Sequence, residues 1–219
     1  MFRIPGSGNI TTKETPVSSF LKLHLGIHGN VELIQSTEEK IVVECDDNLQ
    51  ENVTVQNSGR TLYVYIDSGL RRPSFTHFKL TVYFRQIDTL NISQEGDVTC
   101  TNQIVSDRPF YLEVNAHGNT SVNIKAPSLK CLFRCHGNVE LQGETDDASI
   151  KTMMHGDLMA RQLITKKLQL NAMSHGNAEV YACDEISIKH MSHGNIYYYG
   201  AATLKDVRMH GHGELMHKE

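Results

Sequence analysis

The chain has 219 residues, of which 39% are hydrophobic and 21% are charged, as in an ordinary globular protein rather than a disordered one. Its net charge of -4, with the 12 histidines neutral, provides no basic field for nucleic acid or an anionic membrane. No apolar run approaches the roughly 20 residues that a membrane-spanning helix needs. We therefore expect a globular fold with no membrane span and no nucleic-acid partner.

The N-terminal stretch MFRIPGSGNITTKETP lacks the apolar region of a secretory signal. We expect either the cytoplasm or, if an export signal was trimmed, the cell envelope (periplasm or cell surface). The five cysteines include no C-x-x-C pair, and an odd number cannot all pair within one chain. Because several of them fall at core positions of the pattern described below, we expect reduced, buried thiols.

The segment 34–88 contains four stretches that alternate in polarity or are rich in β-branched residues: KIVVEC, NVTVQ, TLYVYID and FKLTVYF. Polar turns such as NSGR separate them. This pattern predicts antiparallel or irregular β-strands that cap or extend the rest of the fold. The polar stretch DSGLRRPSFTH at 67–77 is the strongest candidate for a mobile loop.

A His-Gly-Asn triplet recurs along the chain, with Asp or Glu in place of Asn in two copies. The copies begin at His28, His117, His136, His155, His175, His193 and His212, and Glu95-Gly96-Asp97 is a variant with Glu in the His position. From His117 onward the copies start 18 to 20 residues apart, which is typical of a solenoid with one coil per repeat. A leucine-rich repeat is disfavoured because its L-x-x-L-x-L signature and a 3.6-residue periodicity are both missing.

Residues at odd offsets from each His, or from Glu95, are apolar almost throughout. Five residues before it stand Leu23, Leu90, Leu112, Cys131, Ile150, Leu170, Ile188 and Val207; three after it stand Val31, Val98, Thr120, Val139, Leu158, Ala178, Ile196 and Leu215; five after it stand Leu33, Cys100, Val122, Leu141, Ala160, Val180, Tyr198 and His217. Odd offsets share one face of an extended chain. The pattern predicts an all-β fold, a single-stranded right-handed parallel β-helix with about 20 residues per coil.

The triplet has a structural interpretation at the corner of each coil. Gly fits a bend that needs a positive φ or a bulge. Asn tolerates left-handed conformations and can bond from coil to coil. The even offsets then turn the His and Asn side chains outward. We expect an exposed, binding-competent imidazole ladder, formed by His117, His136, His155, His175, His193 and His212.

We expect one β-solenoid domain over residues 1–219, with a non-repeating β segment at 34–88 and regular repeats at 89–219. The chain also resembles the putative autotransporter adhesin head GIN domain family of Bacteroidetes. The resemblance rests on PGSGNI at 5–10, on VVECDDNLQENVTVQNSGRTLYVYI at 42–66, and on FKLTVYFRQIDTLNISQEGDV at 78–98. It implies a right-handed β-helix in the cell envelope, a corner at PGSGNI and no known catalysis. His stands here where the family usually carries Ser.

Metal binding is one chemistry that the histidines suggest, because neutral imidazole is a good ligand for Zn, Cu or Ni. The densest local group is His210, His212 and His217 in MHGHGELMHKE. No H-E-x-x-H motif or Cys-rich spacing accompanies them, so they are weak candidates for a metal site. We expect no cofactor. His190 lies in an otherwise mostly apolar column and is predicted to be buried and hydrogen-bonded rather than a ligand.

Catalysis is a second possibility, since some parallel β-helices cleave polysaccharides. The acidic pairs Glu38-Glu39, Asp46-Asp47 and Asp146-Asp147 fall in predicted turns and are interpreted as solvated loop charges. No G-x-S-x-G elbow or comparable motif is present. The sequence therefore predicts no enzyme.

Binding is the third possibility, because solenoids present long regular surfaces. In NIYYYGA, alternation places Tyr198 inside and leaves Tyr197 and Tyr199 outside, available to a partner or a sugar. We expect a non-enzymatic cell-envelope binding or adhesion-like module whose partner is an unidentified protein or glycan. A metal-binding protein that uses the His ladder and a glycan-processing enzyme on a β-helix scaffold are the alternatives.

Overall fold

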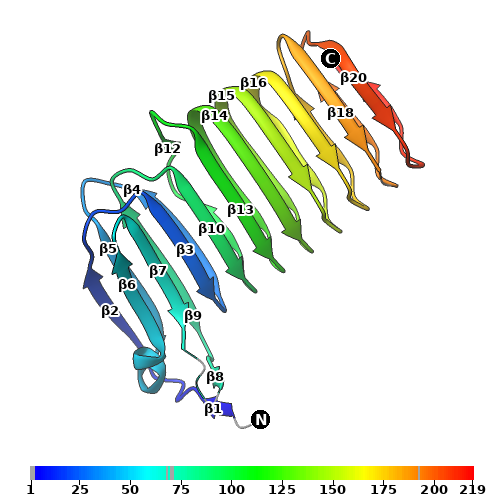
Figure 1. The fold of residues 1–219 in the computed structure, drawn as a ribbon. Coiled ribbons are helices and arrows are strands. Elements are labelled where there is room, and N and C mark those ends of the chain that lie inside the picture. The colour runs from blue at the N-terminus through cyan, green and yellow to red at the C-terminus, as the bar shows by residue number, and fades with distance from the viewer. Residues whose placement is uncertain (1–2, 68, 70–71, 192) are drawn as a thin grey trace.

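Extended segments separated by tight corners give a stack of β-strands in the computed structural model, which describes residues 3–67, 69, 72–191 and 193–219 (Figure 1). The coil strands are β3 (Lys22–Ile27), β4 (Asn30–Gln35), β10 (Thr89–Gln94), β11 (Val98–Cys100), β12 (Ile104–Val105), β13 (Phe110–Ala116), β14 (Thr120–Cys135), β15 (Val139–Thr152), β16 (Leu158–Ala172), β17 (Ala178–Tyr181), β18 (Glu185–His190), β19 (Ile196–Tyr199), β20 (Thr203–Met209) and β21 (Leu215–His217). Neighbouring coils pair in parallel, which confirms the predicted β-solenoid.

The remaining elements form a cap at the N-terminal end of the stack. They are β1 (Arg3–Pro5), β2 (Ile10–Pro16), β5 (Lys40–Asp46), the 3-10 helix η1 (Asp47–Asn52), β6 (Val53–Ser58), β7 (Thr61–Ile66), β8 (Arg72–Ser74) and β9 (Phe78–Phe84). Strands β7 and β9 continue the parallel ladder on β3 and β4, whereas β6, β5 and β2 add to them in antiparallel pairs. The predicted strands of 34–88 therefore do cap the solenoid. No described helix is long and apolar enough to cross a membrane.

In the sequence, most of the cap lies between β4 and β10, although the two coils that contain these strands pair with each other in space. Strand β3 pairs with β7 on one side and with β10 on the other, so Leu23 stands opposite Leu90 although 67 positions separate them in the sequence. The first His-Gly-Asn copy therefore belongs to the same continuous ladder as the later ones. The predicted loop 67–77 includes residues 68, 70 and 71, which lie outside the described residues; Arg72–Ser74 pair with Arg3–Pro5.

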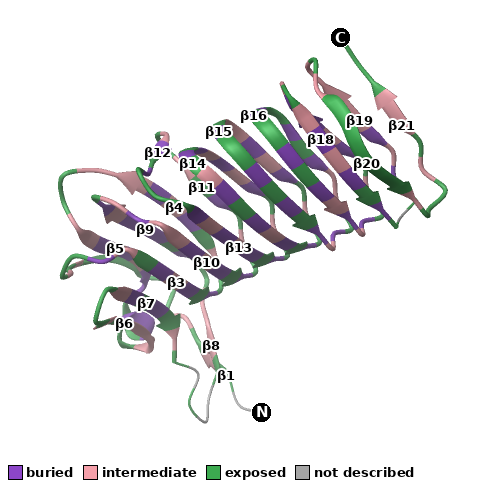
Figure 2. Ribbon diagram, turned by 45° about the horizontal axis from the view of Figure 1, so that its top comes forward, coloured by how far each residue is buried: buried purple, intermediate pink, exposed green. Residues whose placement is uncertain are grey.

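Two of the three predicted columns lie in register through the whole solenoid, whereas the column five residues after each His is interrupted by a β-bulge between Glu140 and Gln142. The column five residues before each His pairs rung by rung from Leu23 to Val207, and the column three residues after it pairs from Val31 to Leu215. Inner members of both columns are buried, and Figure 2 shows this as bands of buried residues that cross successive strands. Each coil covers the apolar face of its neighbour, so the core is continuous.

The last coil departs from the predicted core. Val207 is 38% exposed, Leu215 is half-buried and His217 is exposed, although their columns are buried further inside the stack. Strands β20 and β21 each pair on one side only, with β18 and β19. The apolar pattern of the last coil thus continues, but no further coil among the described residues covers it.

The cysteines behave as predicted. All five are free; Cys45, Cys131 and Cys135 are buried, and Cys100 and Cys183 are half-buried. Burial raises the pKa of the Cys45 thiol to about 11 and raises that of Cys131 further. These thiols are therefore protonated, weak nucleophiles at neutral pH.

A fully buried carboxylate, Asp46, ties the N-terminal segment to the cap. It accepts hydrogen bonds from the Gly8 N–H at 2.8 Å and from the Thr76 N–H and hydroxyl at 2.8 and 2.6 Å. Burial raises its pKa, but these hydrogen bonds and one from His77 lower it to about 2. The interpretation of Asp46 as a solvated loop charge was wrong, because the turn that carries it folds under the N-terminal segment.

The family resemblance implied that the stretch PGSGNI forms a coil corner, but in the structure it does not. It packs on the turn after β5, where Ser7 and Asn9 both donate to the carboxylate of Asp47. Gly8 has a positive φ of 80°. The same residue types thus build a cap contact here rather than a corner.

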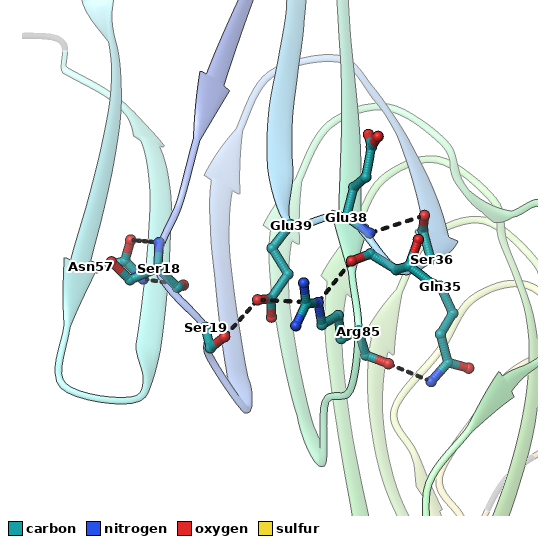
Figure 3. Close-up of polar contacts among 9 residues, drawn as sticks. Ser18, Ser19, Gln35, Ser36, Glu38, Glu39, Asn57 and Arg85 are labelled. Carbon is teal, nitrogen blue, oxygen red and sulfur yellow. Dashed lines mark hydrogen bonds and ion pairs between the residues drawn. The ribbon is translucent and has the colours of Figure 1, made fainter.

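The turn between β4 and β5 shows a second buried acid (Figure 3). The side chain of Glu39 is 8% exposed, accepts a hydrogen bond from the Ser19 hydroxyl at 2.6 Å and lies 3.9 Å from Arg85. Arg85 also donates to the Thr37 carbonyl, and its own carbonyl accepts from Gln35. Glu39, like Asp46, therefore holds loops of the cap together, whereas Glu38 and Asp47 are exposed.

Candidate functional site

The His-Gly-Asn corners lie one above another along one edge of the solenoid, where the arrowheads of β3, β10, β13 and the later coils line up in Figure 1. Six imidazoles form an exposed stack, with ring centroids 4.7, 4.9, 5.3, 5.7 and 5.2 Å apart from His117 to His212. The planes of His155, His175 and His193 are within 5° of parallel. The predicted outward ladder is therefore present; whether it binds anything stays a prediction.

Glu95 occupies the His position of its coil, as its triplet indicated. Its carboxylate lies 3.3 Å from Nδ1 of His28, which stands on the preceding rung. The acid therefore separates His28 from the uninterrupted stack that begins at His117. Among the described side chains, none donates to or accepts from the rings of the six stacked histidines, which leaves their nitrogens available.

Glycine recurs at these corners for a different reason from the one predicted. Of the glycines in the triplets, Gly29 alone has a positive φ in the described chain. At Gly156 an added Cβ would stand 2.4 Å from the carbonyl oxygen of Gly137 on the preceding coil, and Gly118, Gly137 and Gly176 repeat the contact. Glycine is therefore required because successive corners approach too closely for any side chain.

The third residue of each triplet links the coils, as predicted, although not through a left-handed backbone. Its Oδ1 atom accepts a hydrogen bond from the backbone N–H of the equivalent residue one coil further on, at 2.7 to 3.0 Å from Asn30 through to Glu214. No described residue other than glycine has a positive φ. Asp97 and Asp157 serve as well as Asn because the bond needs only an acceptor.

The C-terminal histidines do not converge. His212 stacks on His193, while His217 stacks on Tyr198 at 4.7 Å and its Nε2 lies 2.9 Å from the Gly200 carbonyl. No group of three or more His, Cys, Asp or Glu side chains in the described ranges is placed to hold a metal ion. His210 is exposed on the corner before His212.

The three tyrosines follow the predicted alternation, but the outer two are half-buried rather than open. Tyr198 packs against the core. The guanidinium of Arg161 lies 4.2 Å from the ring centre of Tyr199, and the ammonium of Lys218 lies 5.5 Å from that of Tyr197. Cations of the chain itself therefore occupy one face of each ring, a placement that sequence alternation does not reveal.

His190 is buried, 1% exposed, and its Nε2 lies 2.7 Å from the Gly194 carbonyl. The prediction of a buried, hydrogen-bonded histidine is confirmed. It pairs with Ala172 of the preceding coil, in a column that is otherwise mostly apolar.

The outer surface of one sheet carries a groove that the sequence analysis did not identify. The sheet consists of β10, β13, the second parts of β14, β15 and β16, and β18 and β20. Its groove comprises two adjoining cavities of about 600 and 570 Å³ that share Tyr111, Lys130, Ser149, Gln169 and Ser187. These residues stand in register on successive coils, so the groove crosses the strands and follows the solenoid axis. The even offset of six residues before each His was the signal that could have found it.

The two sides of this groove differ in charge. On one side lie Lys151, Lys189 and Arg208, of which Arg208 pairs with Asp206 at 3.2 Å. On the other side lie Asp147, Lys167 and Glu185 in register. Asp147 and Glu185 are two rungs apart, about 10 Å, with Lys167 between them, which is wider than the usual carboxylate pair of a glycosidase. The groove is therefore suited to polar recognition rather than to acid–base catalysis.

Comparison with known proteins agrees with this architecture. The family model described as "Putative auto-transporter adhesin, head GIN domain" matches residues 19–202. No curated protein matches the sequence. Among solved structures, a putative adhesin from Bacteroides fragilis is 22% identical with a TM-score of 0.88, and the match covers 98% of this chain and 100% of that chain.

Two Parabacteroides structures are also similar. A putative adhesin from Parabacteroides merdae is 17% identical with a TM-score of 0.67, and a putative lipid binding protein from Parabacteroides distasonis is 20% identical with a TM-score of 0.66. Both matches cover 99% of this chain and 100% of the other. At these identities the likeness shows the fold alone.

Proposed function

Because the chain belongs to the putative autotransporter adhesin head GIN domain family, we propose that it is a non-enzymatic binding module of the bacterial cell envelope. The observation that carries the proposal is the long outer face of the sheet from β10 to β20, along which side chains repeat in register from coil to coil. A rigid, periodic face suits contact with a repetitive or extended partner, a protein or a glycan.

The separation of the groove carboxylates supports binding rather than catalysis. General acid–base chemistry on a glycan needs two carboxyl groups at a spacing set by the sugar and a water molecule. In this groove Lys167 stands on the rung between Asp147 and Glu185. This pair of carboxylates is therefore not placed to hydrolyse a bound glycan.

The test presents the purified chain, immobilised on inert beads, to arrays of envelope polysaccharides, host glycans and matrix proteins. We expect saturable retention of at least one ligand, with the length of that ligand unchanged afterwards. Ser149→Trp, which places a bulky ring in the groove, should abolish retention. Met159→Trp is the control, because Met159 is 40% exposed on another face. Shortened products, or retention equal to albumin-coated beads on every surface, would overturn the proposal.

Localisation in the envelope is part of the same proposal and rests on family membership. Cell fractionation of a bacterium that expresses the complete gene tests it. We expect the protein in the periplasmic or surface fraction and accessible to protease added to permeabilised outer membranes. Exclusive recovery with cytoplasmic marker enzymes would contradict it.

Metal binding is a second candidate function, favoured by the uninterrupted imidazole stack. Rings 4.7 to 5.7 Å apart on exposed side chains can turn so that nitrogens of two rungs meet one Zn²⁺, Cu²⁺ or Ni²⁺ ion. Calorimetric titration of tag-free protein with Zn²⁺ tests this. We expect uptake that His136→Ser with His155→Ser reduces and that His77→Ser, a histidine paired with Glu44 elsewhere, leaves unchanged. Equal uptake by all variants would exclude the ladder as the site.

A further inference from the structure

The groove on the β10–β20 sheet is basic on one side, although the chain as a whole is acidic. Its larger cavity is lined by four cations, Lys130, Lys151, Lys189 and Arg208, and by one carboxylate, Asp206. The net charge of the chain is -4. We propose that this groove binds an extended, uronate-bearing polysaccharide, an inference that rests on the proposed binding function and names its ligand class.

Three of the four cations in the larger cavity are not neutralised by a neighbouring acid among the described residues. Lys130, Lys151 and Lys189 are exposed, and none is within ion-pair distance of an acid among the described residues. Lys151 and Lys189 stand two rungs apart in the same outward column, about 10 Å, with Asn171 between them. Unpaired ammonium groups at regular spacing suit carboxylates that recur along a polymer.

The floor and the opposite wall suit the hydroxyl groups of the same polymer. Ser149, Gln169 and Ser187 lie along the floor and can both donate and accept hydrogen bonds. Asp147 and Glu185 on the far side are acceptors for sugar hydroxyls. A ligand that carries carboxylates on one edge and free hydroxyls on the other matches this arrangement.

The length of the groove requires an extended ligand. Its central column contains one residue per coil from Tyr111 to Asp206, which makes six rungs and about 24 Å. That span accommodates several linked sugar rings. Because the strands below are one hydrogen-bonded ladder, the site is formed before the ligand arrives, which lowers the entropy cost of binding.

Other polyanions fit less well. A nucleic acid carries phosphates on its whole outer surface and would bring them against Asp147 and Glu185. An anionic membrane needs a wide basic or apolar face, whereas the groove presents Ser149, Gln169 and Ser187 along its floor and carboxylates on one side. The observations therefore favour a glycan over a nucleic acid or a lipid surface.

The experiment measures binding of polygalacturonate fragments to the full chain by calorimetry or biolayer interferometry at low salt. We expect the triple variant Lys130→Gln, Lys151→Gln and Lys189→Gln to bind roughly tenfold more weakly or worse. The control triple changes Lys13, Lys79 and Lys125 to Gln. These lysines lie outside the groove, in surface ion pairs with Glu51, Glu32 and Glu144, and their replacement removes the same amount of positive charge. Rising salt should weaken wild-type binding.

Neutral dextran, double-stranded DNA and phosphatidylserine vesicles serve as competing probes. Preference for polygalacturonate over all three, with loss in the groove triple alone, supports the inference. Polygalacturonate bound no better than dextran, equal loss in both triples, or tighter binding of DNA or vesicles would overturn it. Retention of other ligands in the array test, without polygalacturonate binding, would reject the uronate class and leave the binding function standing.

Discussion

In the coils, every corner after the first repeats the same two contacts, whereas in the cap each contact occurs once. Gly156 packs on Gly137, and the Asp157 N–H donates to Asn138, just as equivalent residues do one coil earlier and one coil later. In the cap, Asp46 alone collects hydrogen bonds from Gly8 and Thr76.

This difference teaches where each region is vulnerable. A coil corner has no space for an added atom, so a larger residue there should lower the stability of the fold. The Oδ1 hydrogen bond at the corner is one of many equivalent bonds, and it needs only an acceptor atom. The cap has open space at the Gly59 turn, but its buried carboxylate makes contacts that are not repeated elsewhere in the cap. We therefore expect steric changes to harm the coils most and polar changes to harm the cap most.

Gly156→Ala should have the largest effect of the substitutions considered. The new Cβ would lie 2.4 Å from the Gly137 carbonyl oxygen, which is backbone and cannot rotate away. Separating the coils would break parallel hydrogen bonds on both sides, so we expect a loss of about 3 kcal/mol or more in the free energy of unfolding. Urea denaturation followed by circular dichroism measures it.

Gly59→Ala in the cap is the matched control. Gly59 has a φ of +58°, and no atom lies within 4 Å of the point where a Cβ would stand. The cost is therefore that of a left-handed alanine alone, about 1–2 kcal/mol. Equal costs at the two positions would mean that the coil can relax at its corner, and the distinction between the two regions would be lost.

Asp46→Asn should cost about 2 kcal/mol. The amide nitrogen of Asn cannot accept the hydrogen bond that one of the two carboxylate oxygens now receives from Thr76. Asp157→Asn in a coil removes the same charge but keeps the Oδ1 acceptor for Asn177, so its stability should change by less than about 0.5 kcal/mol. Chemical denaturation of both variants gives the comparison, and similar losses would show that charge, rather than buried acceptors, governs both sites.

Acid should remove the contribution of Asp46. Hydrogen bonds outweigh burial and hold its pKa at about 2, below the usual value near 4 of an unfolded chain. Between these values the unfolded chain binds more protons, so stability is present above about pH 4 and is lost as pH falls towards 2. The stability difference between wild type and Asp46→Asn should therefore shrink over this window in urea titrations. A constant difference would rule out the titration of Asp46 as its source.

The contrast between the regions also explains how far the sequence could predict the structure. Apolar columns at odd offsets from His117 or His136 identify buried, paired residues because a solenoid places every copy in the same environment. The cap has no second copy to compare, so the burial of Asp46 and Glu39 was missed. The adjacency of His28 and Glu95 was missed for the same reason, since the inserted cap breaks the period.

At the corners, sequence identified the residues but not the cause. A recurring Gly is consistent with a positive φ or with a close approach, and one copy cannot distinguish them, because the atom that excludes the side chain belongs to the preceding coil. The groove was missed because its even-offset columns mix Ser, Lys, Gln and Tyr, which have no shared chemistry until they are seen side by side.

Asn138→Ala should have a smaller effect than Gly156→Ala or Asp46→Asn. It removes the acceptor for the Asp157 N–H, but this group is near solvent and water can replace the bond, so we expect about 1 kcal/mol. Asn138→Asp should leave the stability nearly unchanged, since Asp97 already accepts the equivalent hydrogen bond, from the Asn119 N–H, on its own coil. Thermal denaturation of both variants measures the difference, and a loss in Asn138→Asp as large as in Asn138→Ala would show that the amide nitrogen is also needed.

His155→Ser should also have a small effect, less than about 0.5 kcal/mol. The ring is exposed, makes no hydrogen bond to the described residues, and stacks on neighbours that keep their positions through the Gly and Asn contacts of the corner. His190→Ser is the contrast, because it removes a buried ring bonded to Gly194 and should cost about 2 kcal/mol. Denaturation midpoints of the two variants decide between the two roles of histidine in this chain. A loss at His155 as large as at His190 would make the ladder a structural element, and the recurrence of His would then need no ligand to explain it.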